Sequence, residues 1–157
     1  MQTITIKPAG TLMHDETGLR EQYAQLQQRA LHLSSHGQSR VDQLAAAMQS
    51  PSTEHADENL RVLSGAADDA MEAVLGYRRA LPFLETANSL IESLAKPSPS
   101  DEDEEWRDQL LFRLAEVLET GADLIAEGEA HLERCTRVNI QGYASWSRTA
   151  MATGAHD

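Results

Sequence analysis

Four side chains that could bind a metal fall into two pairs with helical spacing. His32 and His36 are four residues apart, and so are His131 and Cys135, so each pair can share one face of a helix. Antiparallel packing of neighbouring helices would bring His36, His131 and either Asp68 or Glu72 to about the same level of a bundle. Imidazole, thiolate and carboxylate groups are together suitable ligands for a transition metal.

A structural role explains these residues better than a metal site does. Ser34, Ser35 and Gly37 lower helix propensity around His36, which is typical of a partly exposed turn. Cys135 lies on an apolar stripe, where a buried thiol usually behaves as a small hydrophobic group. We therefore predict no metal and no cofactor, with His131 at least half buried and paired to an acidic or backbone group of the second helix. If a metal site exists, its candidates are His36, Asp68, His131 and Cys135.

The sequence contains none of the common catalytic motifs. It has no glycine-rich phosphate loop, no nucleophile elbow and no HExxH zinc motif. The nearest approach to the Glu-x-x-His ligand pattern of di-iron bundles is Glu127 and His131, whose spacing is wrong. We therefore predict that the protein is not an enzyme.

Composition limits the class of protein further. The chain has 157 residues, a single cysteine, 4% aromatic residues and a net charge of −12. The lone cysteine excludes a disulfide framework, and the negative charge argues against direct binding to nucleic acid. No apolar run approaches the ~20 residues that span a bilayer, and the first residues lack the features of a signal peptide. We expect a cytoplasmic protein of bacterial type that does not bind membranes.

Charge is distributed unevenly along the chain. Residues 1–50 are neutral, residues 51–133 carry a net charge of −14, and residues 134–157 carry +2. The acidic stretch either keeps the protein dispersed in solution or imitates DNA and blocks a nucleic-acid-binding protein. The C-terminal segment mixes arginine with amphipathic aromatic residues, which are enriched at binding hot spots. It predicts a partner-binding surface made by Arg134, Arg137, Tyr143, Trp146 and Arg148.

Heptad-like spacing of apolar residues predicts three long helices. The first stripe runs from Leu19 to Met48, and the second from Leu60 to Leu94 in alternating steps of three and four. The third stripe predicts a helix from about residue 102 to about 138, with an extension through Tyr143 and Trp146 left open. Its acidic start, residues 101–105, suits the positive end of a helix dipole. Pro82 is expected to kink or break the second helix, because proline removes one hydrogen bond and clashes with the preceding turn.

Proline-bearing segments separate the three helices. A turn at Pro51 is followed by Ser52 and Thr53, which are suited to the start of the second helix. The segment from Lys96 to Ser100 contains Pro97 and Pro99 and is the clearest linker. Alternating Thr and Ile at residues 3–6 indicate a short extended arm. The predicted organisation is an N-terminal arm (1–14), one helical-bundle domain (15–150) and a C-terminal tail (151–157).

These observations predict an all-α fold, an elongated up-down-up bundle of three long helices with coiled-coil packing. Helices of roughly 33–45 residues would be about 50–65 Å long, and so thin a bundle leaves apolar surface for association. We therefore expect a homo-oligomer, most simply a dimer. The predicted function is a non-enzymatic protein-interaction module, such as an adaptor, chaperone-like or regulatory protein. The alternatives are an acidic DNA-mimic inhibitor and a helical bundle that binds a metal or small ligand.

Overall fold

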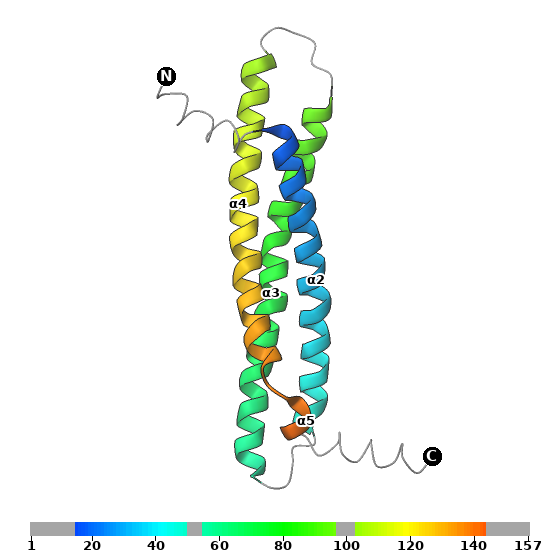
Figure 1. Ribbon diagram of the computed structural model, residues 1–157, viewed down its shortest axis with the longest axis vertical. Helices are drawn as coiled ribbons and strands as arrows, with labels where there is room; N and C mark the ends of the chain where they lie inside the picture. Colours follow the sequence, from blue (N-terminus) through cyan, green and yellow to red (C-terminus); the bar gives the residue numbers. More distant parts are fainter. Residues whose placement is uncertain (1–14, 50–54, 97–102, 144–157) are drawn as a thin grey trace, which may run out of the picture. The chain divides into compact units, whose positions relative to one another are not determined.

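The computed structural model describes residues 15–49, 55–96 and 103–143, and all its regular structure there is α-helical. Three long helices, α2 (Glu16–Gln49), α3 (Ala56–Ala95) and α4 (Asp103–Thr136), are followed by the short α5 (Ile140–Tyr143). The long helices pack as an up-down bundle (Figure 1), which confirms the predicted fold class. The predicted arm (1–14) and tail (151–157) lie outside the described residues.

Local sequence explains where the long helices begin. The Asp15 carboxylate accepts a hydrogen bond from the backbone N–H of Gly18 (3.1 Å) and so caps the start of α2. The acidic run predicted to open the third helix does so, because α4 begins at Asp103 within it. Helix α3 begins at Ala56. Pro51, Ser52 and Thr53, predicted at the start of this helix, lie outside the described residues.

Both helices that contain a helix-weakening segment remain continuous. Helix α2 runs without interruption through Ser34, Ser35 and Gly37. Helix α3 also continues through Pro82, so the predicted alternative of a helix broken at that proline is wrong. Burial of α3 on both sides of the proline offsets the lost hydrogen bond, and Thr86 Oγ1 donates to the Pro82 carbonyl (2.8 Å). Packing in the bundle therefore keeps α3 helical at Pro82, where the helix propensity of the sequence is low.

The predicted stripes of α3 and α4 are confirmed at about every second position, and the positions between them shift by one residue. Leu63, Ala70 and Leu84 of α3 and Leu114 and Cys135 of α4 are buried as predicted. Leu60, expected in the core, is 40% exposed. The α3 seam instead buries an alanine at every seventh residue: Ala66, Ala73, Ala80 and Ala87. In α4 the buried positions keep steps of three and four: Leu111, Leu114, Leu118, Gly121, Ile125, Gly128, Leu132 and Cys135. Small residues in these seams allow the helix backbones to approach closely.

Helix α4 ends close to its predicted end at about residue 138. The helix stops at Thr136, and the chain turns through residues 137–139 before α5, so the continuation through Tyr143 that the sequence left open does not form. The Val138 N–H donates to the Cys135 carbonyl (3.2 Å), which tightens the last turn. Ile140, in α5, is buried. A buried apolar residue just after the turn explains why the chain folds back.

The chain divides into two compact units, each made from part of every long helix. The first contains residues up to 31 together with residues 78–125, and the second contains residues 32–77 and those from 126 onward. In each unit, stretches of α2, α3 and α4 lie side by side (Figure 1). Among the described residues, no helix is both long and apolar enough to cross a membrane. The candidate functional residues described below belong to the second unit.

Candidate functional site

Arg40 is a charged residue at a core position of the second unit. The α2 seam passes through Leu33, Gly37, Leu44 and Ala47, all of which are buried. Position 40 falls three residues after Gly37 and four before Leu44, so it continues the same seam. Arg40 is accordingly only partly exposed. A guanidinium at such a position must find hydrogen-bond acceptors inside the bundle.

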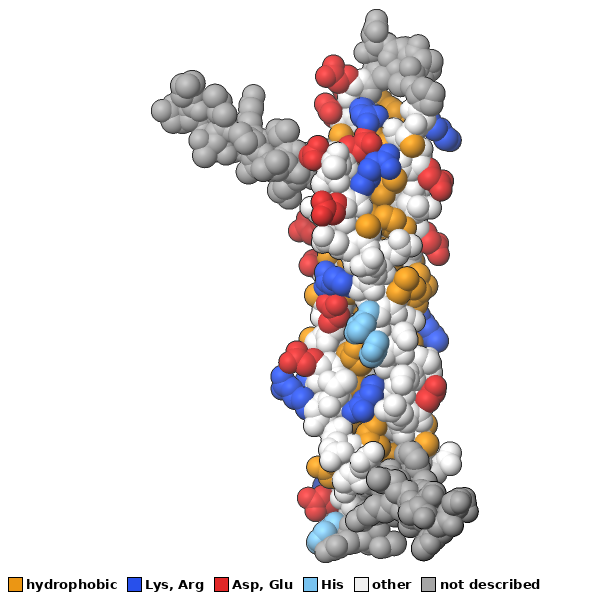
Figure 2. Space-filling model, turned by 45° about the vertical axis from the view of Figure 1, so that its right-hand side comes forward, with side chains coloured by type: hydrophobic (Ala, Val, Ile, Leu, Met, Phe, Trp, Pro, Cys, Tyr) orange, Lys and Arg blue, Asp and Glu red, His pale blue; other side chains and the backbone are white. Residues whose placement is uncertain are grey.

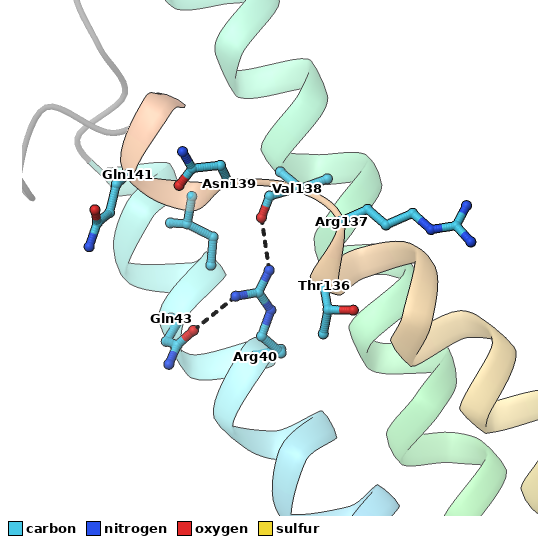
Figure 3. Close-up of a pocket in the computed structure, with 8 residues that line it drawn as sticks. Arg40, Gln43, Thr136, Arg137, Val138, Asn139 and Gln141 are labelled. Carbon is cyan, nitrogen blue, oxygen red and sulfur yellow. Dashed lines mark hydrogen bonds between the residues drawn. The ribbon is translucent and has the colours of Figure 1, made fainter.

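Those acceptors are backbone carbonyls at the end of α4. Arg40 Nη2 donates to the carbonyl oxygens of Cys135 (2.8 Å) and Val138 (2.9 Å). Arg40 Nη1 donates to Gln43 Oε1 (3.3 Å), as Figure 3 shows. The last carbonyls of a helix have no partner within the helix and carry its negative dipole. Arg40 therefore caps α4 from another helix and fixes the turn that leads to α5.

A pocket of about 510 Å³ lies against this turn. Arg40 and Gln43 of α2 form one side of it and the turn with α5 forms the other (Figure 3). We call it the α4–α5 pocket, and its lining consists of Arg40, Gln43, Thr136, Arg137, Val138, Asn139, Ile140 and Gln141. Its volume is in the range of small-ligand sites. Most of its side chains end in a guanidinium, amide or hydroxyl group.

The structure describes three of the five predicted partner-binding residues. Arg137 lines the α4–α5 pocket with a 71% exposed side chain, and its Nη2 donates to Glu133 (2.8 Å). Tyr143 is half-buried at the end of α5, and Arg134 points toward Asp69 of α3. Trp146 and Arg148, the other two predicted residues, lie outside the described residues. Arg137, predicted in the last turn of the third helix, lies just beyond the end of α4 at Thr136.

Asp69, His131 and Arg134 form a separate polar cluster between α3 and α4. His131 Nδ1 lies 2.8 Å from Asp69 Oδ1, and the His131 side chain is 22% exposed. This confirms the prediction that His131 is mostly buried and paired to an acidic group of the second helix. Arg134 Nη2 also lies 2.7 Å from His131 Nδ1. Because ionised Asp69 can only accept and Arg134 can only donate, Nδ1 forms a hydrogen bond with one of them at a time. The bond to His131 holds the pKa of Asp69 below its usual value, although burial acts in the opposite direction and Arg134 adds a smaller lowering effect.

The predicted metal candidates do not converge. His36 is exposed and stacks on His32, with ring centroids 3.8 Å apart, and its Nδ1 bonds to the His32 carbonyl. Asp68 is exposed, and His131 binds its neighbour Asp69 instead. Among the described residues, no three His, Cys, Asp or Glu side chains are grouped to hold a metal ion.

The thiol of Cys135 belongs to the interior of the second unit. It is fully buried, and its Sγ donates to the Leu132 carbonyl (3.2 Å). Burial raises the pKa of this thiol, and the nearby Arg40 guanidinium offsets only part of that effect. A raised pKa disfavours the thiolate, which is the reactive form of cysteine. The thiol is therefore a packing group beneath the α4–α5 turn.

Acidic and basic side chains are mixed over the surface that Figure 2 shows. Neither sign forms a continuous field on that face. Beyond the pairs described above, Arg107 of α4 binds Glu16 of α2 and the Leu94 carbonyl of α3 in the first unit. Within the acidic stretch of residues 51–133, Asp69 is paired with Arg134 and Glu133 with Arg137, so part of its charge is balanced locally.

Arg40, Gln43, Asn139 and Gln141 were missed as site residues in the sequence. One signal could have found Arg40, because it occupies a heptad position between Gly37 and Leu44. A lone arginine at a core position requires an internal acceptor. The other three residues carry no such signal, since exposed amides are common on helices and turns.

Comparison of the chain with models of known protein families, with curated proteins and with solved structures finds no match.

Proposed function

We propose that this protein is a non-enzymatic protein-interaction module that binds its partner at the α4–α5 pocket. The observation that carries the proposal is the pocket itself, which combines an arginine-bearing rim with an apolar floor at Val138 and Ile140. Interfaces commonly place arginine and apolar anchors together, with a polar rim around them. Arg137 of the predicted partner-binding set is part of this rim.

The rigidity of the site supports the proposal. Arg40 of α2 donates hydrogen bonds to two backbone carbonyls at the turn. The side chain of Ile140, at the start of α5, is buried. The exposed pocket residues Thr136, Asn139 and Gln141 are therefore carried on an anchored turn. A preorganised surface binds more tightly because less conformational entropy is lost on association.

A capture experiment with matched variants tests the proposal. Tagged full-length wild type, Gln141→Trp, which fills the pocket, and Arg137→Ala are used to isolate proteins from the native host. The control is Arg113→Ala, which removes an exposed arginine of α4 in the first unit. A purified partner is then titrated against all four proteins by calorimetry.

We expect both pocket variants to weaken binding by about tenfold or more, equivalent to one lost charged hydrogen bond. Arg113→Ala should bind like wild type. Equal affinity of all four proteins would contradict a partner site at the pocket. The acidic-inhibitor alternative would be favoured by a partner that binds nucleic acid and whose affinity for this protein falls steeply with salt. Its affinity would also be the same for wild type and for both pocket variants.

We also propose self-association, most simply as a dimer, through the side of α3 that carries Leu60 and Met71. Both side chains are at least 40% exposed, and a separation of eleven residues places them on the same side of a helix. Sedimentation velocity of wild type should show a concentration-dependent dimer. Met71→Lys should shift it to monomer, while the control Gln109→Lys on α4 should not. A wild type that sediments as a monomer at all concentrations would refute self-association.

A further inference from the structure

The α4–α5 pocket is a cationic site in an acidic protein. Its eight lining residues include two arginines, three amides and a threonine, and none of them is acidic. The chain as a whole has 25 acidic and 13 basic residues. The absence of a carboxylate among the lining residues therefore contrasts with the surface charge of the rest of the molecule.

The charge of Arg40 has no acidic hydrogen-bond partner among the described residues. Its three bonds go to two backbone carbonyls and one amide oxygen, all of which are neutral. Its Nε is buried and has no hydrogen-bond partner there. A partly buried guanidinium that only neutral dipoles compensate retains a strong attraction for an anion.

Arg137 lies at the edge of the pocket as a second cation, and its side chain points away from Arg40 (Figure 3). Its guanidinium donates to Glu133, four residues earlier, and the two side chains are 71% and 68% exposed. An ion pair this exposed contributes little free energy. A carboxylate that enters the pocket can therefore compete with Glu133 for Arg137.

We propose that the α4–α5 pocket binds a carboxylate side chain from an acidic segment of the partner protein. This inference rests on the proposed function and specifies its chemistry. Arg137 and the exposed amides of Asn139 and Gln141 would supply the donors, beside the uncompensated charge of Arg40. A single carboxylate suits the site better than a polyanion, because the net charge of −12 repels dense negative charge.

Nuclear magnetic resonance of the full chain tests the proposal. The probe is an acetylated, amidated Gly-Gly-Glu-Gly-Gly peptide, which carries a single carboxylate, and the matched control is the same peptide with Gln in place of Glu. Inorganic phosphate is titrated separately. The side-chain Nε–H signal of Arg40 reports on the pocket, and Arg137→Gln and Arg113→Gln serve as the test and control variants.

The acidic peptide should shift the Arg40 signal to saturation, with an affinity at least about tenfold above that of the Gln peptide and of phosphate. Arg137→Gln should weaken that binding about tenfold, and Arg113→Gln should leave it unchanged. Three results would each overturn the proposal: no saturable shift, equal binding of the Gln peptide or phosphate, or equal binding by Arg137→Gln.

The two proposals can fail separately. If a captured partner depends on Arg137 and Gln141 but the acidic peptide does not bind, the carboxylate proposal fails and the interaction function stands. If the peptide binds and no protein partner depends on the pocket, the proposed function fails.

Discussion

Arg40 Nη2 lies 2.9 Å from the carbonyl oxygen of Val138, a residue 98 positions further along the chain. This bond joins a core position of α2 to the turn beyond α4, and it leaves the guanidinium beside the α4–α5 pocket. Arg40 thus holds the turn that follows α4. It also contributes a positive charge to the α4–α5 pocket. The structural role can be tested apart from any ligand.

Replacing Arg40 with alanine should lower the free energy of unfolding by about 2 kcal/mol, because two carbonyls lose a charged donor. Arg61→Ala, which removes an exposed arginine of α3, should change it by less than about 0.5 kcal/mol. Urea denaturation measures both values. Hydrogen exchange at the Val138 and Gly142 amides should accelerate in Arg40→Ala alone, and equal exchange in both variants would show that Arg40 does not hold the turn.

Two glycines should respond in opposite ways to the same substitution. A Cβ on Gly128 would lie 2.7 Å from Leu33 Cδ2 and 3.2 Å from the Ala73 carbonyl oxygen, whereas a Cβ on Gly65 would meet nothing within 4 Å. Gly128→Ala should therefore destabilise the protein by about 1–3 kcal/mol through overpacking. Gly65→Ala should stabilise it by roughly 0.5–1 kcal/mol through higher helix propensity. Thermal unfolding of both variants measures the effects, and a stabilising Gly128→Ala would disprove the close packing of α4 against α2 and α3.

Pro82→Ala should raise the free energy of unfolding by about 1 kcal/mol or more. Helix α3 is continuous through Pro82, which is exposed, so alanine can restore the hydrogen bond to the Arg78 carbonyl without a clash. The control is Ser89→Ala, at another exposed position of the same helix, where only the small propensity gain is expected. Chemical denaturation followed by circular dichroism measures both. A Pro82→Ala protein that is less stable than wild type would indicate that the bundle requires the proline.

Acid should weaken the Asp69–His131 bond. The hydrogen bond from His131 lowers the pKa of Asp69 in the folded protein, so this carboxylate contributes stability above the usual aspartate pKa of about 4. That contribution is lost as the pH falls through the lowered, folded-state pKa. Between about pH 5 and pH 2, wild type should lose about 1 kcal/mol more stability than Asp69→Asn. Asp68→Asn, at the exposed neighbouring position, should follow wild type. If the free energies of unfolding of wild type and Asp69→Asn fell equally with pH, the contribution of the Asp69 carboxylate would be excluded.

The sequence by itself determined the number and class of the long helices. Leu19, Leu26 and Leu33 follow one another at intervals of seven residues, and such an amphipathic stripe predicts a helix because the stripe must be buried to hold a helix in water. The prediction that His131 would meet an acidic group of the second helix also succeeded. A half-buried imidazole needs a hydrogen-bond partner, and acidic residues are frequent on that helix.

Tertiary packing decided which residues face the core and where α4 ends. Leu60 is 40% exposed, whereas Ala66 and Ala73 are buried, because small side chains allow neighbouring helices to approach closely. The segment from Arg137 to Tyr143 contains the weak helix formers Val138, Asn139 and Gly142, so its sequence disfavours a helix without specifying the residue at which α4 stops. The stop arises because Arg40, distant in the chain, takes the last carbonyls of α4 and Ile140 finds a buried site. The pocket is a product of that long-range contact, and no local pattern of residues encodes it.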